Sequence, residues 1–256
     1  MIYDCFRYFN EEEVVEIRME ILDKWVDKFV VTECSVAHNG LPIPQRFPDL
    51  LKGKLSKFAH KVIYNYVTNS PTDLDPFERD AWQRERSLDL IRNCNDDDIV
   101  LMSDLDEIPD LSEESFDLCR QHGLVHFRHE MFMYFLNLHK ESGWYGTRMM
   151  TGKFVKPNHS RQIRDHMRDQ GVSYFGGWHW TFIGGHQRMT EKIESYCHQE
   201  FNNALIKSYL KKNVQEERDI FFRYGDQKFQ LWEFDERFPD FVRNNRDRFN
   251  SLIKVS

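Results

Sequence analysis

The stretch IVLMSDLDEIPD, residues 99–110, decides the fold and locates a candidate binding site. Its first residues, IVLMS, are apolar or small and predict a buried strand, and Asp104, Asp106 and Glu107 follow at once. In extended backbone Asp104 and Asp106 point to one side and Glu107 points to the other. Carboxylates with free coordination positions suit Mg²⁺ or Mn²⁺ that also holds a diphosphate. The stretch therefore predicts a metal–phosphate site at the end of a strand.

An acidic turn exposed to solvent is the alternative that the residues leave open. In that case Asp110 or Ser112 caps the helix that follows, and no ion binds. The place of the turn after an apolar strand, with a third acid and no basic neighbour, favours the metal site.

The composition is that of a folded, acidic protein. The 256 residues can form one α/β domain, and 35 Lys and Arg against 42 Asp and Glu argue against general nucleic-acid binding. No apolar run approaches the roughly 18 residues of a membrane span, and the N-terminus lacks a signal-peptide pattern. The five cysteines are scattered and never in CxxC spacing, which disfavours a zinc site. We therefore expect a soluble, cytoplasmic protein with reduced thiols.

The first 123 residues alternate strand and helix patterns, which implies parallel strands with right-handed crossovers. Asn10 and Glu13 form a capping-box pattern at the start of the first helix. Ligands bind beyond the carboxyl ends of such strands, so Glu33 and Asp104 belong on the binding edge. The expected strands are residues 2–6, 29–34, 61–67 and 99–104, and the helix before the last of them is 77–92.

From about residue 124 the pattern changes to longer, less regular strands, which predicts a mixed or antiparallel addition. We expect one domain over residues 1–256, with halves at 1–123 and 124–256. The further strands are expected at residues 124–139, 147–155 and 172–185, and the helices at 188–196, 202–209, 214–222 and 240–253.

Several polar and aromatic side chains could bind a nucleotide and a sugar. Glu33 could accept from a nucleobase or ribose, and Gln83 and Arg84 lie on the helix that leads to the acidic strand, where an arginine can grip a diphosphate. In GGWHWTFIGG, Trp178 could stack on a sugar ring and His179 could join the metal shell or bind phosphates. Structural roles remain open for each: a solvated strand end, an exposed helix face, or core packing.

Taken together, VVTEC, the QR pair, SDLDEIP, GGWH and KIES resemble glycosyltransferase family seventeen, over nearly the whole chain from Met1 to about Tyr209. Its best-known members are bisecting β-1,4-N-acetylglucosaminyltransferases that act on the core mannose of N-glycans. The resemblance implies a GT-A-like α/β fold, a nucleotide-sugar-binding half followed by an acceptor-binding half, a DxD site for Mn²⁺ or Mg²⁺, a UDP-sugar donor and inversion at the anomeric carbon. Animal members carry a membrane anchor and stem, whereas this chain starts at the first strand of the catalytic domain, so we expect a soluble bacterial or viral relative or a trimmed form of a longer protein.

The resemblance also implies roles for single residues. Asp106 would coordinate the ion directly, and Asp104 would bind metal-bound water, or the ribose and the ion jointly. His179 would complete the metal shell or bind the phosphates, and Arg84 and Lys192 would bind the phosphates.

Inversion by single displacement needs a carboxylate near the acceptor hydroxyl. The candidates are Glu107, Asp165, Glu191 and Glu194, and we prefer Glu107 and Glu194.

The expected function is transfer of a sugar, N-acetylglucosamine first, from a UDP-sugar to a glycan hydroxyl. Residues 140–169 show little match to the family, so UDP-xylose or UDP-glucose as donor stays open, as does an inactive carbohydrate-binding relative. A nucleotidyl- or phosphotransferase lacks support because there is no GxxxxGK[ST] loop.

Overall fold

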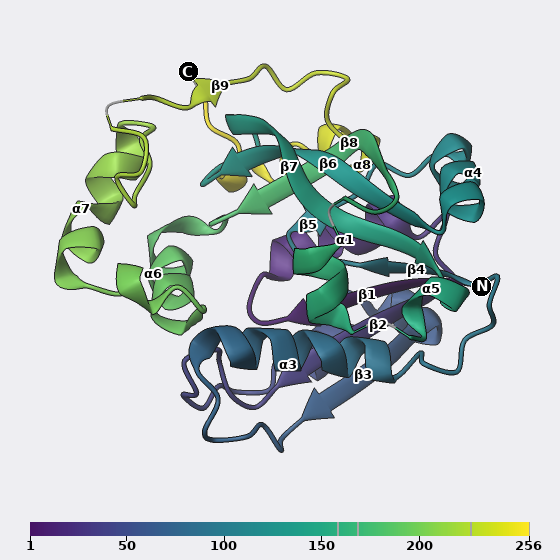
Figure 1. Cartoon of the computed structure of the whole chain (residues 1–256). Coiled ribbons are helices and arrows are strands. Elements are labelled where there is room, and N and C mark those ends of the chain that lie inside the picture. The colour runs from purple at the N-terminus through teal and green to yellow at the C-terminus, as the bar shows by residue number, and fades with distance from the viewer. Residues whose placement is uncertain (158, 168, 226, 256) are drawn as a thin grey trace.

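The computed structural model describes residues 1–157, 159–167, 169–225 and 227–255. Within these ranges the strands form one sheet with the order β3-β2-β1-β4-β7-β6-β8-β5, and β9 pairs with β7 (Figure 1). The strands are β1 (Ile2–Tyr8), β2 (Lys28–Cys34), β3 (Val62–Val67), β4 (Ile99–Met102), β5 (Glu107–Ile108), β6 (Leu124–Met133), β7 (Leu138–Thr151), β8 (Val172–Thr181) and β9 (Gln230–Leu231). The α-helices are α1 (Glu12–Leu22), α2 (Phe47–Lys52), α3 (Pro76–Asp89), α4 (Glu113–His122), α5 (Gly152–Val155), α6 (Gly185–Ser195), α7 (Ala204–Gln215) and α8 (Asp240–Asn244).

The first half of the chain forms the parallel part of the sheet, β3-β2-β1-β4. Its strands are rich in apolar residues that point to both faces, because helices cover both faces. Val14 of α1 packs on the face that carries Phe29, whereas Leu88 of α3 packs on the face that carries Val30. The predicted α/β fold, with a parallel sheet between helices, is confirmed.

The second half adds the antiparallel part that the irregular strands predicted. β7 pairs antiparallel with β4 and β6, and β8 runs parallel to β6 and antiparallel to β5. The acidic turn therefore leads from β4, in the parallel part, to β5 at the far side of β8. Gly177 permits this pairing, because its φ is 106° and a Cβ there would lie 2.4 Å from the carbonyl oxygen of Ile108. One sheet runs through both halves, and the division at residue 123 stays a prediction.

Helices α6 and α7 follow each other at the left of Figure 1, and Arg188 of α6 pairs with Glu13 of α1. The apolar side chains of α6 and α7 share a cluster with the ends of β6 and β8, which includes Met133, Phe182, Ile193 and Leu210. This packing places α6 beside the carboxyl edge of the sheet. No described helix combines the length and the apolar character that crossing a bilayer requires.

Several local predictions are wrong. The last four residues of the expected strand 147–155 form α5, and the expected strand 124–139 is interrupted between β6 and β7. Asn10 does not cap α1, which begins at Glu12 without a side-chain cap, because the Asn10 amide donates to Glu191 instead. No helix spans residues 214–222: α7 ends at Gln215 and the chain then turns through positive φ at Glu217 and Phe222. The expected helix at residues 240–253 is divided into α8 and a short 3₁₀ turn at Asn250–Leu252. Ser112, one of the two caps that the solvent-exposed alternative offered, caps α4.

Candidate active site

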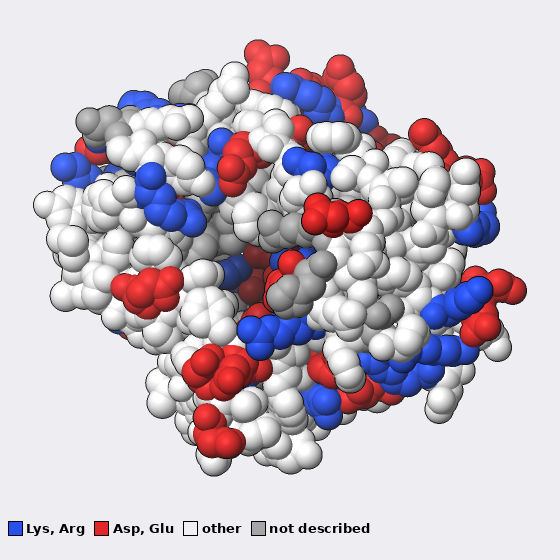
Figure 2. Space-filling model, in the orientation of Figure 1, with Lys and Arg blue, Asp and Glu red and all other residues white. Residues whose placement is uncertain are grey.

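A cavity of about 470 Å³ opens at the carboxyl edge of the parallel strands. Figure 2 shows it as a hollow near the centre of this face, with acidic and basic side chains inside. Arg7 and Cys34 contribute from the ends of β1 and β2, and Asp104, Asp106 and Glu107 contribute from the acidic turn. The cavity lies where the carboxyl-edge rule predicted a binding site.

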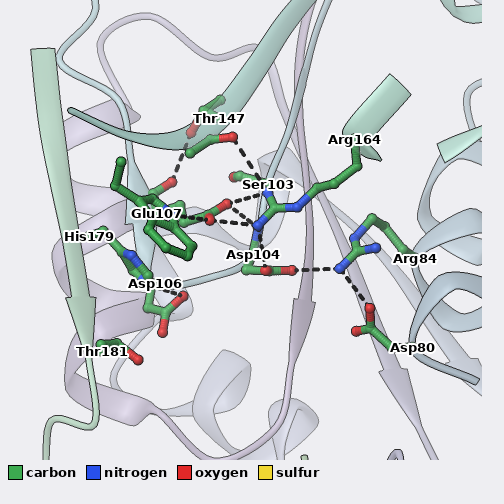
Figure 3. Close-up of polar contacts among 12 residues, drawn as sticks. Asp80, Arg84, Ser103, Asp104, Asp106, Glu107, Thr147, Arg164, His179 and Thr181 are labelled. Atoms are coloured by element: carbon green, nitrogen blue, oxygen red, sulfur yellow. Dashed lines mark hydrogen bonds and ion pairs between the residues drawn. The ribbon is translucent and has the colours of Figure 1, made fainter. Parts of the chain in front are cut away.

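The acidic turn is not extended, and this changes the directions of its side chains. The strand ends at Met102, and the backbone N–H of Glu107 donates to the carbonyl of Asp104 at 3.1 Å. Figure 3 shows Asp104 turned toward Arg84, whereas Asp106 points to the side of His179. The expectation that the two aspartates face one way is therefore wrong, because it assumed strand geometry for residues that form a turn.

A buried arginine holds this turn from behind. Arg18 of α1 forms a double ion pair with Asp4 of β1, at 2.8 and 2.5 Å, and both side chains are fully buried. The Arg18 guanidinium also donates to the carbonyl oxygens of Asp104, Leu105 and Glu107. The backbone of the acidic turn is thus fixed by a charge that does not itself line the cavity.

Asp104 is the centre of an arginine network in the cavity. Its oxygens lie 2.8 Å from Arg7, 3.4 Å from Arg84 and 3.0 Å from Arg164. Asp80 of α3 accepts from Arg7 and Arg84 as well, at 2.7 and 2.9 Å. Burial alone would raise the pKa of the Asp104 carboxyl, but the arginines, Arg164 first, hold it well below its usual range. The Asp104 carboxylate is therefore ionised, and the arginines around it already compensate its negative charge.

Glu107 is saturated with hydrogen-bond donors. Arg164 binds both of its oxygens, at 2.6 and 2.7 Å, the indole N–H of Trp144 donates at 2.8 Å, and the backbone N–H of Asp104 donates at 3.1 Å. The Glu107 side chain is 1% exposed. A carboxylate whose two oxygens already accept four hydrogen bonds positions its neighbours and has no oxygen open to an acceptor hydroxyl.

Asp106 stands on the other side of the turn. Its Oδ2 lies 2.8 Å from Nζ of Lys192, on α6, and its Oδ1 lies 3.6 Å from Nε2 of His179. Burial would raise the pKa of Asp106, but Lys192 and then His179 outweigh it, and the pKa lies below its usual range. Asp106 Oδ1, with His179 at 3.6 Å, has fewer close hydrogen-bond partners than the carboxylate oxygens of Asp104.

These residues fit a divalent ion in a specific way. Within the described ranges, no three His, Cys, Asp or Glu side chains form a group that could hold one. These residues therefore do not form a three-residue ligand set, and the roles of Asp104, Asp106 and His179 at an ion stay predictions. Mg²⁺-type sites use one or two carboxylates and leave the other positions to water and substrate phosphates, and Asp106 Oδ1 can serve in such a site.

Three predicted binding residues and the base candidate Glu194 lie elsewhere or make other contacts. Glu33 does not line the cavity: it accepts from the backbone N–H groups of Arg46 and Phe47 at the start of α2 and from the Tyr64 hydroxyl. Trp178 stacks on Trp180 in the core, because alternate residues of β8 share a face. Glu194 pairs with Lys207 outside the cavity. Gln83 does line the cavity and donates to the Val36 carbonyl.

Arg84, His179 and Lys192 line the cavity as predicted. The residues that the prediction missed are Arg7, Arg18, Asp80, Trp144 and Arg164. Arg7 had a usable signal, since it ends β1 at the same edge as Asp104, and Asp80 had one, since it lies four residues before Arg84 on α3. Trp144 and Arg164 come from the stretch at residues 140–169, where no pattern pointed to them.

The chain resembles known glycosyltransferases. It is 30% identical to the human and the rat β-1,4-mannosyl-glycoprotein 4-β-N-acetylglucosaminyltransferase over 107 residues, which are 39% of this chain and 20% of each relative. Among solved structures, the mannosyltransferase PcManGT from Pyrobaculum calidifontis, in complex with GDP-Man and Mn²⁺, has 9% identity and a TM-score of 0.44 over 87% of this chain and 66% of its own. TarS from S. aureus has 11% identity and a TM-score of 0.44 over 98% and 83%. The family model described as glycosyltransferase family 17 matches residues 1–226, and the chain therefore belongs to glycosyltransferase family 17.

Proposed function

We propose that this chain is a metal-dependent, inverting glycosyltransferase that transfers N-acetylglucosamine from UDP-N-acetylglucosamine to a hydroxyl group of a glycan. The observation that carries the proposal is the place of Asp106, in a cavity at the carboxyl edge of the sheet, beside a cluster of cationic side chains. The family and the names of the curated relatives support the reaction class and the transferred sugar.

Glycosyl transfer from a nucleotide sugar releases a diphosphate, whose charge must be stabilised. A divalent ion at Asp106 would supply a Lewis acid for that leaving group. Lys192 and the arginines around Asp104 line the same cavity and would stabilise the charge that develops on the phosphates. Arg18 keeps the acidic turn in place while these groups act.

The general base that we propose is Asp165. Of the four carboxylates considered from the sequence, only Glu107 and Asp165 line the cavity. Glu107 is saturated with donors, whereas the Asp165 side chain is exposed and makes no hydrogen bond or ion pair with any described residue. A free carboxylate at the mouth of the cavity can take the proton of an acceptor hydroxyl that enters from solvent.

Nucleotide binding tests the proposal without knowledge of the acceptor. The melting temperature is measured with UDP-, GDP- and CMP-sugars, each with and without Mn²⁺. UDP-N-acetylglucosamine with Mn²⁺ at about 100 times its Kd should stabilise the protein by about 2.7 kcal/mol. For a chain of this length that is a shift of roughly 5–10 °C.

Two variants control the measurement. Asp106→Asn should lose the Mn²⁺-dependent part of the shift, and Asp117→Asn, on the exposed surface of α4, should keep it. The proposal fails if no nucleotide sugar raises the melting temperature, or if Asp106→Asn responds as the wild-type protein does.

A further inference from the structure

Lys192 contacts the acidic turn differently from the arginines beside it. Its Nζ lies 2.8 Å from Oδ2 of Asp106, whereas Thr181 Oγ1 is 3.5 Å away and Glu11 Oε1 is 3.8 Å away. The Lys192 side chain is 21% exposed, so the packing around it does not enclose it completely. Within the part of the chain that the structure describes, Asp106 is the main partner of this ammonium group.

Lys192 differs from the arginines beside it in the freedom of its head group. A lysine ammonium is a point charge on a flexible stem, whereas the guanidinium of Arg84 is a rigid fork, here fixed between two carboxylates. If Lys192 left Asp106, the ammonium group would need another anion in the cavity.

We propose that Lys192 exchanges partners during donor binding: it neutralises Asp106 in the free protein and binds the donor diphosphate when a divalent ion occupies Asp106. The exchange rests on the proposed function. Two cations on one carboxylate repel each other strongly at close range, so Lys192 leaves when the ion arrives. The diphosphate is the anion that replaces Asp106 as its partner.

The exchange makes the affinities for metal and donor depend on each other. In the free protein an ion must displace Lys192 from Asp106 and leave the ammonium group only its more distant partner Glu11, which weakens metal binding. When the diphosphate is present, the displaced ammonium has a partner, and metal binding becomes tighter. Such coupling is reciprocal, so the metal strengthens donor binding by the same factor. Asp104 takes no part in the exchange, because three arginines already hold it.

Lys192→Met tests the exchange because it should change two affinities in opposite directions. Mn²⁺ binding is measured by titration calorimetry in the absence of nucleotide, and UDP binding is then measured at saturating Mn²⁺. The variant should bind Mn²⁺ at least about fivefold more tightly than the wild-type protein and UDP at least about fivefold more weakly. Lys192→Gln repeats the test with a polar side chain, should the methionine variant fail to fold.

The control is Lys207→Met, on α7, where the lysine pairs with Glu194 outside the cavity; both affinities should stay at wild-type values. A folded Lys192 variant that binds Mn²⁺ with equal or lower affinity than the wild-type protein overturns the exchange, even if its UDP affinity falls. Wild-type protein that binds no UDP in the presence of Mn²⁺ shows instead that the proposed function is wrong, and the exchange with it.

Discussion

Two arginine networks meet at the acidic turn, and they differ in what surrounds them. Behind the turn, Arg18 and Asp4 are 0% exposed, and Arg18 donates to backbone carbonyls. In front of it, Asp104 is 30% exposed, and its arginines line the cavity. The rear network holds the backbone in one geometry, whereas the front network presents charged groups to whatever enters the cavity.

The difference shows how one short stretch serves structure and chemistry together. The rear pair lies in the dry core, where each charge is compensated by its partner and by hydrogen bonds. The front cluster is wetter, so its charges can change partners at lower cost. Mutations in the two networks should therefore have different effects, the rear ones on stability and the front ones on binding and rate.

The largest effect is expected at the rear. Arg18→Met leaves Asp4 as an unpaired buried charge, and it removes three hydrogen bonds to the acidic turn. The free energy of unfolding, measured with urea, should fall by about 3–5 kcal/mol.

Arg84→Met is the matched change at the front, because it also removes an arginine from two carboxylates. The loss in the free energy of unfolding should be less than half of the loss in Arg18→Met, since solvent reaches Asp104. Equal losses for the two variants would remove the distinction between the networks.

A catalytic effect is expected at the front, at Asp165. Asp165→Asn should lower the rate of sugar transfer at least about 100-fold, the lower end for loss of a general base, and the acid limb of the pH–rate profile should disappear. UDP affinity with Mn²⁺ should not change, because the proposed role concerns the acceptor.

Asp169→Asn, an exposed aspartate of the same segment that does not line the cavity, is the control and should keep the wild-type rate. Full activity in Asp165→Asn would rule out this residue as the base.

The smallest expected effect is a dependence of stability on pH that arises from His38, which contacts the front network. His38 Nε2 lies 3.0 Å from Arg7 and 3.4 Å from Asp80, and burial lowers the pKa of His38 to about 4. The unfolded chain, with a histidine pKa of about 6.5, takes up this proton first as pH falls, so stability decreases between about pH 6.5 and 4.

By this linkage the free energy of unfolding of the wild-type protein should fall by up to about 2 kcal/mol between pH 7 and 5 because of His38. In His38→Asn this part of the decrease should be absent. Urea unfolding of both proteins at the two pH values measures it. An unchanged pH dependence in the variant would mean that His38 does not contribute to it.

Much of the site could be predicted because its signals are local. A run such as IVLMS predicts a buried strand, alternation with helices predicts parallel pairing, and carboxylates after the strand then lie on the ligand-binding edge. The roles of side chains whose surroundings depend on distant residues were harder to predict. The Trp178 side chain is of a type that can stack on a sugar ring, yet the alternation of side chains along β8 directs it into the core beside Trp180. Glu33 ends its strand as expected, yet the start of α2 occupies its oxygens.

The sequence by itself determined the fold class, the edge that carries the site and the acidic residues at its centre, since each follows from periodicity or from neighbours along the chain. Only the tertiary structure decided which cation each acid meets. Lys192 reaches Asp106 across 86 positions, and Arg164 reaches Asp104 across 60. The two aspartates, two residues apart, have different partners because the backbone turns between them. Such contacts depend on how distant segments pack, and no local pattern encodes them.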